Sequence, residues 1–291
     1  MTRVLTELIE LLALERIEEN LFRGQSQDLG WGQVFGGQVL GQALSAAVQT
    51  VDPQRHVHSL HAYFLRPGDA KRPIVYSVDR LRDGGSFSTR RVVAVQGGQP
   101  IFNLATSFQL DEPGMDHADA MPDTVGPDGL PSELELWQRY SQRLPDGARS
   151  RALAERPIEL RPVDPIDPFD PHKASPSHAV WLRAAGPLPD DPALHRYLLA
   201  YCSDFAFVTT AMRPHGKTWI DPRMQVASLD HVMWFHRPFR MDDWLLHVMH
   251  SPSASGARGL VRGSIFSRDG RLVASTGQEG LVRERSRPRS Q

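Results

Sequence analysis

The feature of this chain that most constrains its fold is an internal repeat of one helix followed by four strands. In the first copy, an apolar stretch with helical character at 38–49 precedes four strand-like segments. These segments lie at roughly 57–66, 72–81, 87–96 and 101–110. The second copy keeps this order, with a helix at 192–212 and strands at roughly 224–237, 243–251, 258–267 and 272–282. A helix and an antiparallel meander that occur twice predict two copies of one small fold in a single chain.

Turn signals recur at matching places in the two copies. Arg66-Pro67 returns 171 residues later as Arg237-Pro238, and Gly97-Gly98 corresponds to Asp269-Gly270 at an offset of 172 residues. Glycine and proline mark the turns between periodic segments, so these pairs locate equivalent loops. The strands and loops of the two copies therefore have nearly equal lengths.

The helix at 38–49 is apolar on nearly all sides, which indicates that it is buried. Wrapping an antiparallel sheet around the helix buries it, so we predict an α+β fold with two tandem helix-wrapped sheets. The predicted units are a first repeat, a linker with a short helix, a second repeat and a tail, at 1–112, 113–150, 151–285 and 286–291. Ser132, with Glu135 three residues later, predicts the cap of the linker helix, which we expect to end at Leu144.

Composition and charge exclude several classes of protein. The chain has 291 residues and a formal net charge of −1, so it has no overall electrostatic attraction to nucleic acid or to an anionic membrane. Arginines cluster only at Arg283–Arg289, which we interpret as a solvated terminus rather than a nucleic-acid-binding arm. Partners of the nucleic-acid and membrane classes are therefore not expected.

Cysteine usage and the amino terminus bear on the compartment. The single cysteine, Cys202, rules out an intramolecular disulfide and favours a reducing environment. Residues 1–16 alternate apolar and acidic side chains at helical spacing, which predicts an amphipathic helix and not a signal peptide. No apolar stretch has the length of a membrane span, and we expect a cytoplasmic protein.

A carboxylate on the second helix is the first candidate for chemistry. Asp204 lies among apolar residues. Burial of an unpaired charge there costs roughly several kcal/mol, so the carboxylate needs polar partners or a water-filled cleft. Alternation along 224–237 predicts Ser228 and Asp230 on one strand face and His231 on the other, while Gln278 lies on the last strand. A carboxylate, a hydroxyl and an amide could together hold one water molecule and accept its proton.

Five motifs, in order along the chain, resemble the acyl-CoA thioesterase II family: Leu21–Gln25 (LFRGQ), Val34–Gln38 (VFGGQ), His61–Gly68 (HAYFLRPG), Asp230–Pro238 (DHVMWFHRP) and Ala274–Gly280 (ASTGQEG). The resemblance implies a double hot-dog fold and hydrolysis of acyl-CoA to a free acid and CoA, without a cofactor or a metal. It also implies a homodimer or homotetramer. The catalytic aspartate, threonine and glutamine of the family fall on Asp204, Ser228 and Gln278, so a serine replaces the usual threonine.

The resemblance implies direct attack by water rather than an acyl-enzyme. Gly36 and Gly37, at the start of the first buried helix, are candidates for donating backbone N–H groups to the oxyanion. The alternative is that these glycines only allow close packing of the helix.

Other functions are weaker alternatives. A nucleophilic Ser228–His231 pair is disfavoured by the predicted opposite faces, and Cys202 by its apolar surroundings. A metal site at His56, His58 and His61 is disfavoured because only two of the three share a strand face. The serine at position 228 leaves a non-catalytic acyl-CoA binding protein open. A hot-dog enoyl-CoA hydratase would need an Asp–His pair, and Asp230 and His231 are predicted on opposite faces.

Overall fold

The computed structural model describes residues 1–30, 32–144 and 146–286. The first half of the chain forms α1 (Arg3–Leu12), β1 (Glu15–Glu18), β2 (Leu21–Gly24), α2 (Gly36–Val48), β3 (Arg55–Phe64), β4 (Ile74–Asp83), β5 (Phe87–Gln96) and β6 (Gln99–Leu110). The linker forms α3 (Glu133–Tyr140), a short 3-10 helix η1 (Ser141–Arg143) and α4 (Asp146–Ala152).

The second half repeats the order of the first. It forms β7 (Ile158–Pro162), β8 (Ser177–Ala184), α5 (Pro192–Ser203), α6 (Phe207–Thr210), η2 (Arg213–His215), β9 (Met224–Ser228), β10 (Asp230–Phe235), β11 (Leu245–Ser255), β12 (Arg258–Ser267) and β13 (Leu272–Glu284). A strand pair precedes the long helix in both halves, so the repeated unit also includes these two strands.

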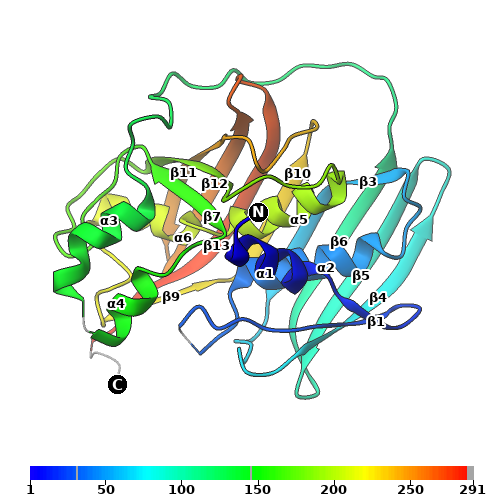
Figure 1. The fold of residues 1–291 in the computed structure, drawn as a ribbon, viewed down its shortest axis with the longest axis horizontal. Helices are drawn as coiled ribbons and strands as arrows, with labels where there is room; N and C mark the ends of the chain where they lie inside the picture. Colours follow the sequence, from blue (N-terminus) through cyan, green and yellow to red (C-terminus); the bar gives the residue numbers. More distant parts are fainter. Residues whose placement is uncertain (31, 145, 287–291) are drawn as a thin grey trace.

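The two halves share one continuous sheet (Figure 1). Its order is β1-β2-β4-β5-β6-β3-β10-β13-β12-β11-β8-β7, with β9 paired to β13 beside this path. The order outward from the centre is equivalent in both halves, and the halves join where β3 and β10 pair antiparallel, with Val232 opposite His61. The predicted tandem architecture is present.

The predicted simple meander is wrong in one respect. β3 pairs with β6 rather than with β4, and β10 likewise pairs with β13 rather than with β11. The tight turns at 84–86 and 97–98 hold hairpins, whereas the longer connection at 65–73 lets the chain cross to the other side of the unit. This crossing leaves β3 and β10 in the middle of the molecule, where they join the two repeats.

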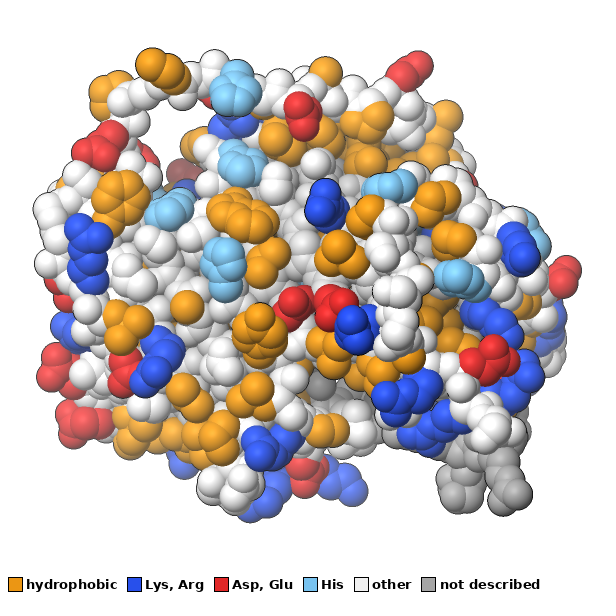
Figure 2. Space-filling view, turned by 180° about the vertical axis from the view of Figure 1, so that it is seen from behind, with side chains coloured by type: hydrophobic (Ala, Val, Ile, Leu, Met, Phe, Trp, Pro, Cys, Tyr) orange, Lys and Arg blue, Asp and Glu red, His pale blue; other side chains and the backbone are white. Residues whose placement is uncertain are grey.

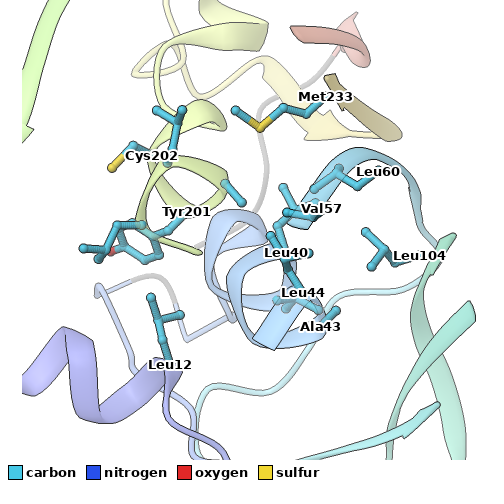
Figure 3. Packing of buried hydrophobic residues seen from close by; sticks show 14 of the residues in the cluster. Leu12, Leu40, Ala43, Leu44, Val57, Leu60, Leu104, Tyr201, Cys202 and Met233 are labelled. Carbon is cyan, nitrogen blue, oxygen red and sulfur yellow. The ribbon is translucent and has the colours of Figure 1, made fainter. Parts of the chain in front are cut away.

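The buried helix α2 lies at the centre of the core (Figure 3). Its side chains Leu40, Ala43 and Leu44 are fully buried and lie between the sheet, α1 and α5. A Cβ on Gly37 would meet the carbonyl oxygen of Tyr201, and one on Gly41 would approach that of Tyr197. The residue numbers rise along α2 as they fall along α5, so the two helices run antiparallel in close contact.

The predicted helix over 192–212 is interrupted in the structure. Asp191 caps α5 by accepting the Ala193 amide hydrogen at 2.9 Å, and Pro192 occupies its first turn, as the sequence indicated. The helix ends at Ser203, and Ala206 has a left-handed backbone with φ of 61° before α6 begins. Asp204 is therefore the C-cap residue that directly follows α5 rather than one inside a longer helix.

The linker and the tail complete the comparison with the sequence-based predictions. The linker runs along the upper edge of the molecule in Figure 1, from the first half to the second, and then forms α3, whose cap residue Ser132 makes the predicted capping box with Glu135. The division into 1–112, 113–150 and 151–285 stays a prediction. The tail lies outside the described residues from position 287 onward.

Helices cover one face of the sheet, whereas on the other face the linker residues Met121 and Leu130 pack over buried side chains of the second half, among them Trp181. Viewed from behind in Figure 2, hydrophobic and histidine side chains lie close together over the middle of the molecule. On this outer face Trp234 of β10 contacts His61 of β3, with ring centroids 5.4 Å apart. Along the described stretches of the chain, no helix is long and apolar enough to cross a membrane. The functional groups described next lie on the inner, helix-covered face.

Candidate active site

Asp204 lies where the end of α5 meets the beginning of α2. A Cβ on Gly36 would be 2.6 Å from Asp204 Oδ2, so only a glycine leaves room for the carboxylate there. The side chain is half-buried, and its Oδ1 is directed at the sheet. The end of one helix thus presents a carboxylate at the start of the other.

Ser228 and Gln278 reach Asp204 from two neighbouring strands. The Ser228 hydroxyl donates to Asp204 Oδ1 at 3.2 Å, and the Gln278 amide nitrogen donates to the same oxygen at 3.1 Å. The amide nitrogen also donates to Ser228 Oγ at 2.6 Å. All three residues that the sequence singled out therefore lie in one hydrogen-bonded cluster.

The strand predicted over 224–237 is bent at Leu229, which changes which side chains share a face. β9 ends at Ser228 and pairs with the last part of β13, while β10 begins at Asp230 and pairs with β3 and with an earlier part of β13. The register with β13 shifts by one residue between the two strands. The Asp230 carboxylate accepts the backbone amide hydrogen of Glu279 at 2.6 Å, so this side chain bonds to the neighbouring strand at the bend. Regular alternation therefore fails between Ser228 and His231.

As a result, His231 faces the active-site cluster, and the predicted opposite faces of Ser228 and His231 are wrong. His231 Nδ1 lies 2.6 Å from Gln278 Oε1, and Nε2 lies 2.9 Å from Ser203 Oγ. Ser203 and His231 are both fully buried. Burial holds the pKa of His231 below its usual value, despite the opposing effect of the nearby Asp204 carboxylate.

The sequence-based interpretation missed His231 and Ser203. The available signal was the string Asp230–Pro238, whose second residue is this histidine, but strict alternation placed it on the wrong side. Ser203 gave no signal beyond its position next to Asp204. Both residues became visible only when the bend at Leu229 was known.

The two candidate glycines have different environments. A Cβ on Gly37 would lie 2.1 Å from the Tyr201 carbonyl oxygen, so this glycine is required for the close contact of α2 with α5. Gly36 lies beside Asp204 at the first position of α2. Among the described residues, no acceptor pairs with the backbone N–H of either glycine. Packing and oxyanion binding are therefore compatible at this helix start.

Aromatic residues lie next to the residues of the cluster, with Phe35 directly before Gly36 and Phe205 directly after the aspartate. Phe35 stacks on Phe205 with centroids 4.7 Å apart, and it meets the edge of Tyr201 at 5.3 Å. Phe64 lies within contact distance of Gly36. An apolar wall next to a half-buried carboxylate suits a substrate with a hydrocarbon portion.

The other candidate nucleophile and the three histidines lie apart from this cluster. Cys202 is fully buried, and burial raises the pKa of its thiol well above the usual value, which disfavours the thiolate. His58 bonds to Ser107, and His56 lies near Asp111. Over residues 1–30, 32–144 and 146–286, no three His, Cys, Asp or Glu side chains are grouped as a metal site requires.

Comparison with known proteins gives matches over almost the whole chain. Residues 147–281 match the acyl-CoA thioesterase family, and residues 26–109 match the acyl-CoA thioesterase N-terminal domain. The chain is 45% identical to acyl-CoA thioesterase 2 of Haemophilus influenzae, over 97% of this chain and 99% of that protein.

Solved structures agree. The chain is similar to acyl-CoA thioesterase II TesB2 from Mycobacterium marinum, with a TM-score of 0.78 and 46% identity, covering 96% of this chain and 99% of that one. A conserved protein with a hot-dog fold from Alicyclobacillus acidocaldarius has a TM-score of 0.75 at 20% identity, covering 95% and 98% of the two chains. The fold is the α+β hot-dog fold in tandem, and the chain belongs to the acyl-CoA thioesterase II family.

Proposed function

We propose that this acyl-CoA thioesterase releases free acid and CoA without an acyl-enzyme, by direct attack of a water molecule held by Asp204, Ser228 and Gln278. The observation that carries the proposal is the convergence of these three side chains, from the end of α5 and from two strands, around one carboxylate oxygen. Asp204 and Ser228 are half-buried, whereas Gln278 is buried, so substrate and water approach from the side of the aspartate and the serine.

Each group has a separate part in the reaction. The Asp204 carboxylate accepts a proton from the water as its oxygen attacks the thioester carbonyl carbon. Ser228 and Gln278 orient the water, because between them they offer a hydroxyl and an amide at hydrogen-bond distance from the aspartate. The tetrahedral intermediate then collapses and expels the CoA thiolate. A thiol has a pKa of about 8.5, so this leaving group needs little help from an acid.

The oxyanion needs hydrogen-bond donors at the same place. Gly36 and Gly37 open α2 beside Asp204, and the start of a helix presents backbone N–H groups and a partial positive charge to an anion. We assign the oxyanion to this helix start. The two glycines then serve both helix packing and oxyanion binding, since the close packing that Gly37 allows also brings the helix start next to the aspartate.

Two other functions predict different results in an assay. A non-catalytic acyl-CoA binding protein would bind substrate without releasing thiol. A hydratase would add water to an enoyl-CoA and leave the thioester intact. The complete burial of His231, with both ring nitrogens occupied by protein partners, disfavours the hydratase because that histidine has no free nitrogen for substrate.

The proposal is tested by comparing wild-type protein with Asp204→Asn in a thiol-release assay over short- to long-chain acyl-CoAs. Asparagine keeps the shape of the side chain but cannot accept the proton, so kcat should fall by roughly 100-fold or more. Asp190→Asn is the matched control, because Asp190 precedes the other end of α5 with its side chain 94% exposed. Equal turnover by wild type and Asp204→Asn would place the chemistry elsewhere.

A further inference from the structure

Two buried polar side chains next to the cluster have no part in the mechanism proposed above. His231 lies on β10 and Ser203 ends α5, and both are completely inaccessible to solvent. They contact each other, and His231 also contacts Gln278. A buried polar chain that ends on a residue proposed to bind the reacting water calls for a physical explanation.

The direction of every hydrogen bond in this chain follows from Asp204. An ionised carboxylate can only accept, so the group of Gln278 that lies 3.1 Å from Asp204 Oδ1 must be the amide NH2. The opposite side of the amide, the carbonyl oxygen Oε1, then faces His231 Nδ1 at 2.6 Å. That oxygen also can only accept, so His231 Nδ1 carries the proton and donates it.

The same logic extends to Ser203. Burial favours the neutral imidazole by lowering the pKa of His231. The Ser203 hydroxyl lies 2.9 Å from both His231 Nε2 and the Ala200 carbonyl oxygen, and it has one hydrogen to donate. A neutral ring that is protonated on Nδ1 has only a lone pair on Nε2, so in this tautomer the hydroxyl hydrogen goes to Nε2. The hydrogen bonds therefore run in one direction, from Ser203 through His231 and Gln278 to Asp204.

We propose that His231 and Ser203 are positioning residues, which lock the Gln278 amide in the one orientation that directs its NH2 group at Asp204 and Ser228. The proposal rests on the proposed function, in which that NH2 group helps to hold the attacking water. Without the donor at His231 Nδ1, the amide can turn over. Its oxygen would then face the Asp204 carboxylate and the Ser228 hydroxyl, and both of its donors to the water-binding cluster would be lost.

Two substitutions of the same histidine separate positioning from packing. Asparagine places its amide nitrogen where the imidazole has Nδ1, so His231→Asn can still donate to Gln278 Oε1. Glutamine extends to the place of Nε2, so His231→Gln reaches toward Ser203 and leaves Gln278 without its donor. Both variants remove the ring that packs on Phe207, with centroids 5.7 Å apart, and a role in packing alone affects both alike.

We expect His231→Asn to retain kcat within about threefold of wild type. His231→Gln should lose roughly 100-fold in kcat with KM nearly unchanged, as expected when a reacting group is misplaced in a bound complex. Thermal midpoints are recorded for both variants. Equal kcat in the two, a lower kcat in His231→Asn, or losses that follow the thermal midpoints would overturn the proposal.

Ser203→Ala gives an independent measurement. It tests the positioning role even if the His231→Gln variant does not fold. It removes the hydroxyl that fixes the proton on Nδ1 and should lower kcat roughly tenfold, as loss of one buried hydrogen bond does, again with little change in KM. Unchanged kcat in Ser203→Ala would overturn its positioning role.

Asp204→Asn is assayed beside these variants to separate this proposal from the function on which it rests. Full turnover by Asp204→Asn would overturn both. Collapse of Asp204→Asn, together with equal turnover by the two His231 variants, would overturn the positioning role alone.

Discussion

Ser228 is the residue of the proposed site at which the family resemblance implies a threonine instead of a serine. The hydroxyl is kept, and it lies 3.2 Å from Asp204 and 2.6 Å from the Gln278 amide. Threonine would add a methyl group that restricts rotation about χ1 and so holds the hydroxyl in one direction. We therefore predict that Ser228→Thr raises kcat severalfold, by about two- to tenfold, because the water is then better oriented.

The measurement is kcat for thiol release from one acyl-CoA at saturation, and Ser228→Ala is the matched variant. Alanine removes the hydroxyl and leaves one hydrogen of the Gln278 amide without its partner, so kcat should fall well below that of wild type. A Ser228→Ala enzyme as fast as wild type would remove Ser228 from the mechanism.

At the scale of single residues, the family resemblance indicated three residues that do lie together, whereas the periodicity of the sequence placed one neighbouring residue on the wrong strand face. Asp204, Ser228 and Gln278 were singled out by their residue types and positions and again by the family resemblance, and in the structure they lie in one cluster. His231 was assigned by alternation alone and to the wrong face. Alternation counts residues along an unbroken strand. Both β9 and β10 pair with β13, but the register shifts by one residue between Ser228 and Val232, which a single sequence does not specify.

At the scale of secondary-structure elements, the contact between α2 and α5 is the arrangement on which the site most depends. Gly37 lies so close to α5 that a Cβ would be 2.1 Å from the Tyr201 carbonyl oxygen, a distance that forces the helices apart. Tyr201 is one turn before Asp204, so movement of α5 displaces the carboxylate. We predict that Gly37→Ala lowers kcat by roughly 100-fold and costs about 1–3 kcal/mol of stability.

Gly41→Ala is the control for this prediction, because it lies one turn further along the same helix and faces the same partner. There a Cβ would be 3.2 Å from the Tyr197 carbonyl oxygen and 2.8 Å from the end of the flexible Leu12 side chain. The gain in helix propensity, about 1 kcal/mol, offsets part of the crowding. Activity and urea midpoints of both variants are compared; similar losses in the two would show that the contact at Gly37 has no special role.

The lengths of most elements were predictable, but their interruptions were not. Hydrophobic periodicity located α2, β5 and β12 to within two residues, since each is a regular element with a buried face. It extended α5 through Asp204 to 212, because the residues of α6 continue the apolar pattern. A left-handed alanine at position 206 leaves no signal in composition, so the end of α5 became visible only in three dimensions.

At the scale of the whole molecule, the tandem arrangement was predictable from the repeat, whereas the joining of the two sheets was not. The repeat shows that two similar units exist, but the strand order shows that they share a sheet through β3 and β10. One apolar core also runs through both halves, with Leu40 and Phe102 of the first and Leu199 and Met233 of the second among its buried residues. The second half adds two smaller buried clusters of its own, one around Phe207 and one around Trp181.

A shared core and a shared sheet predict that the two repeats unfold together. Five of the six tryptophans lie between positions 137 and 244, so tryptophan fluorescence reports mainly on the second half, while far-ultraviolet circular dichroism reports on both. We expect the two signals to give the same urea midpoint in a single transition, because unfolding one half exposes β3 or β10 and the helix face buried against its partner. Two separated midpoints would show instead that each repeat is stable alone, and the contacts between α2 and α5 would then add little to folding.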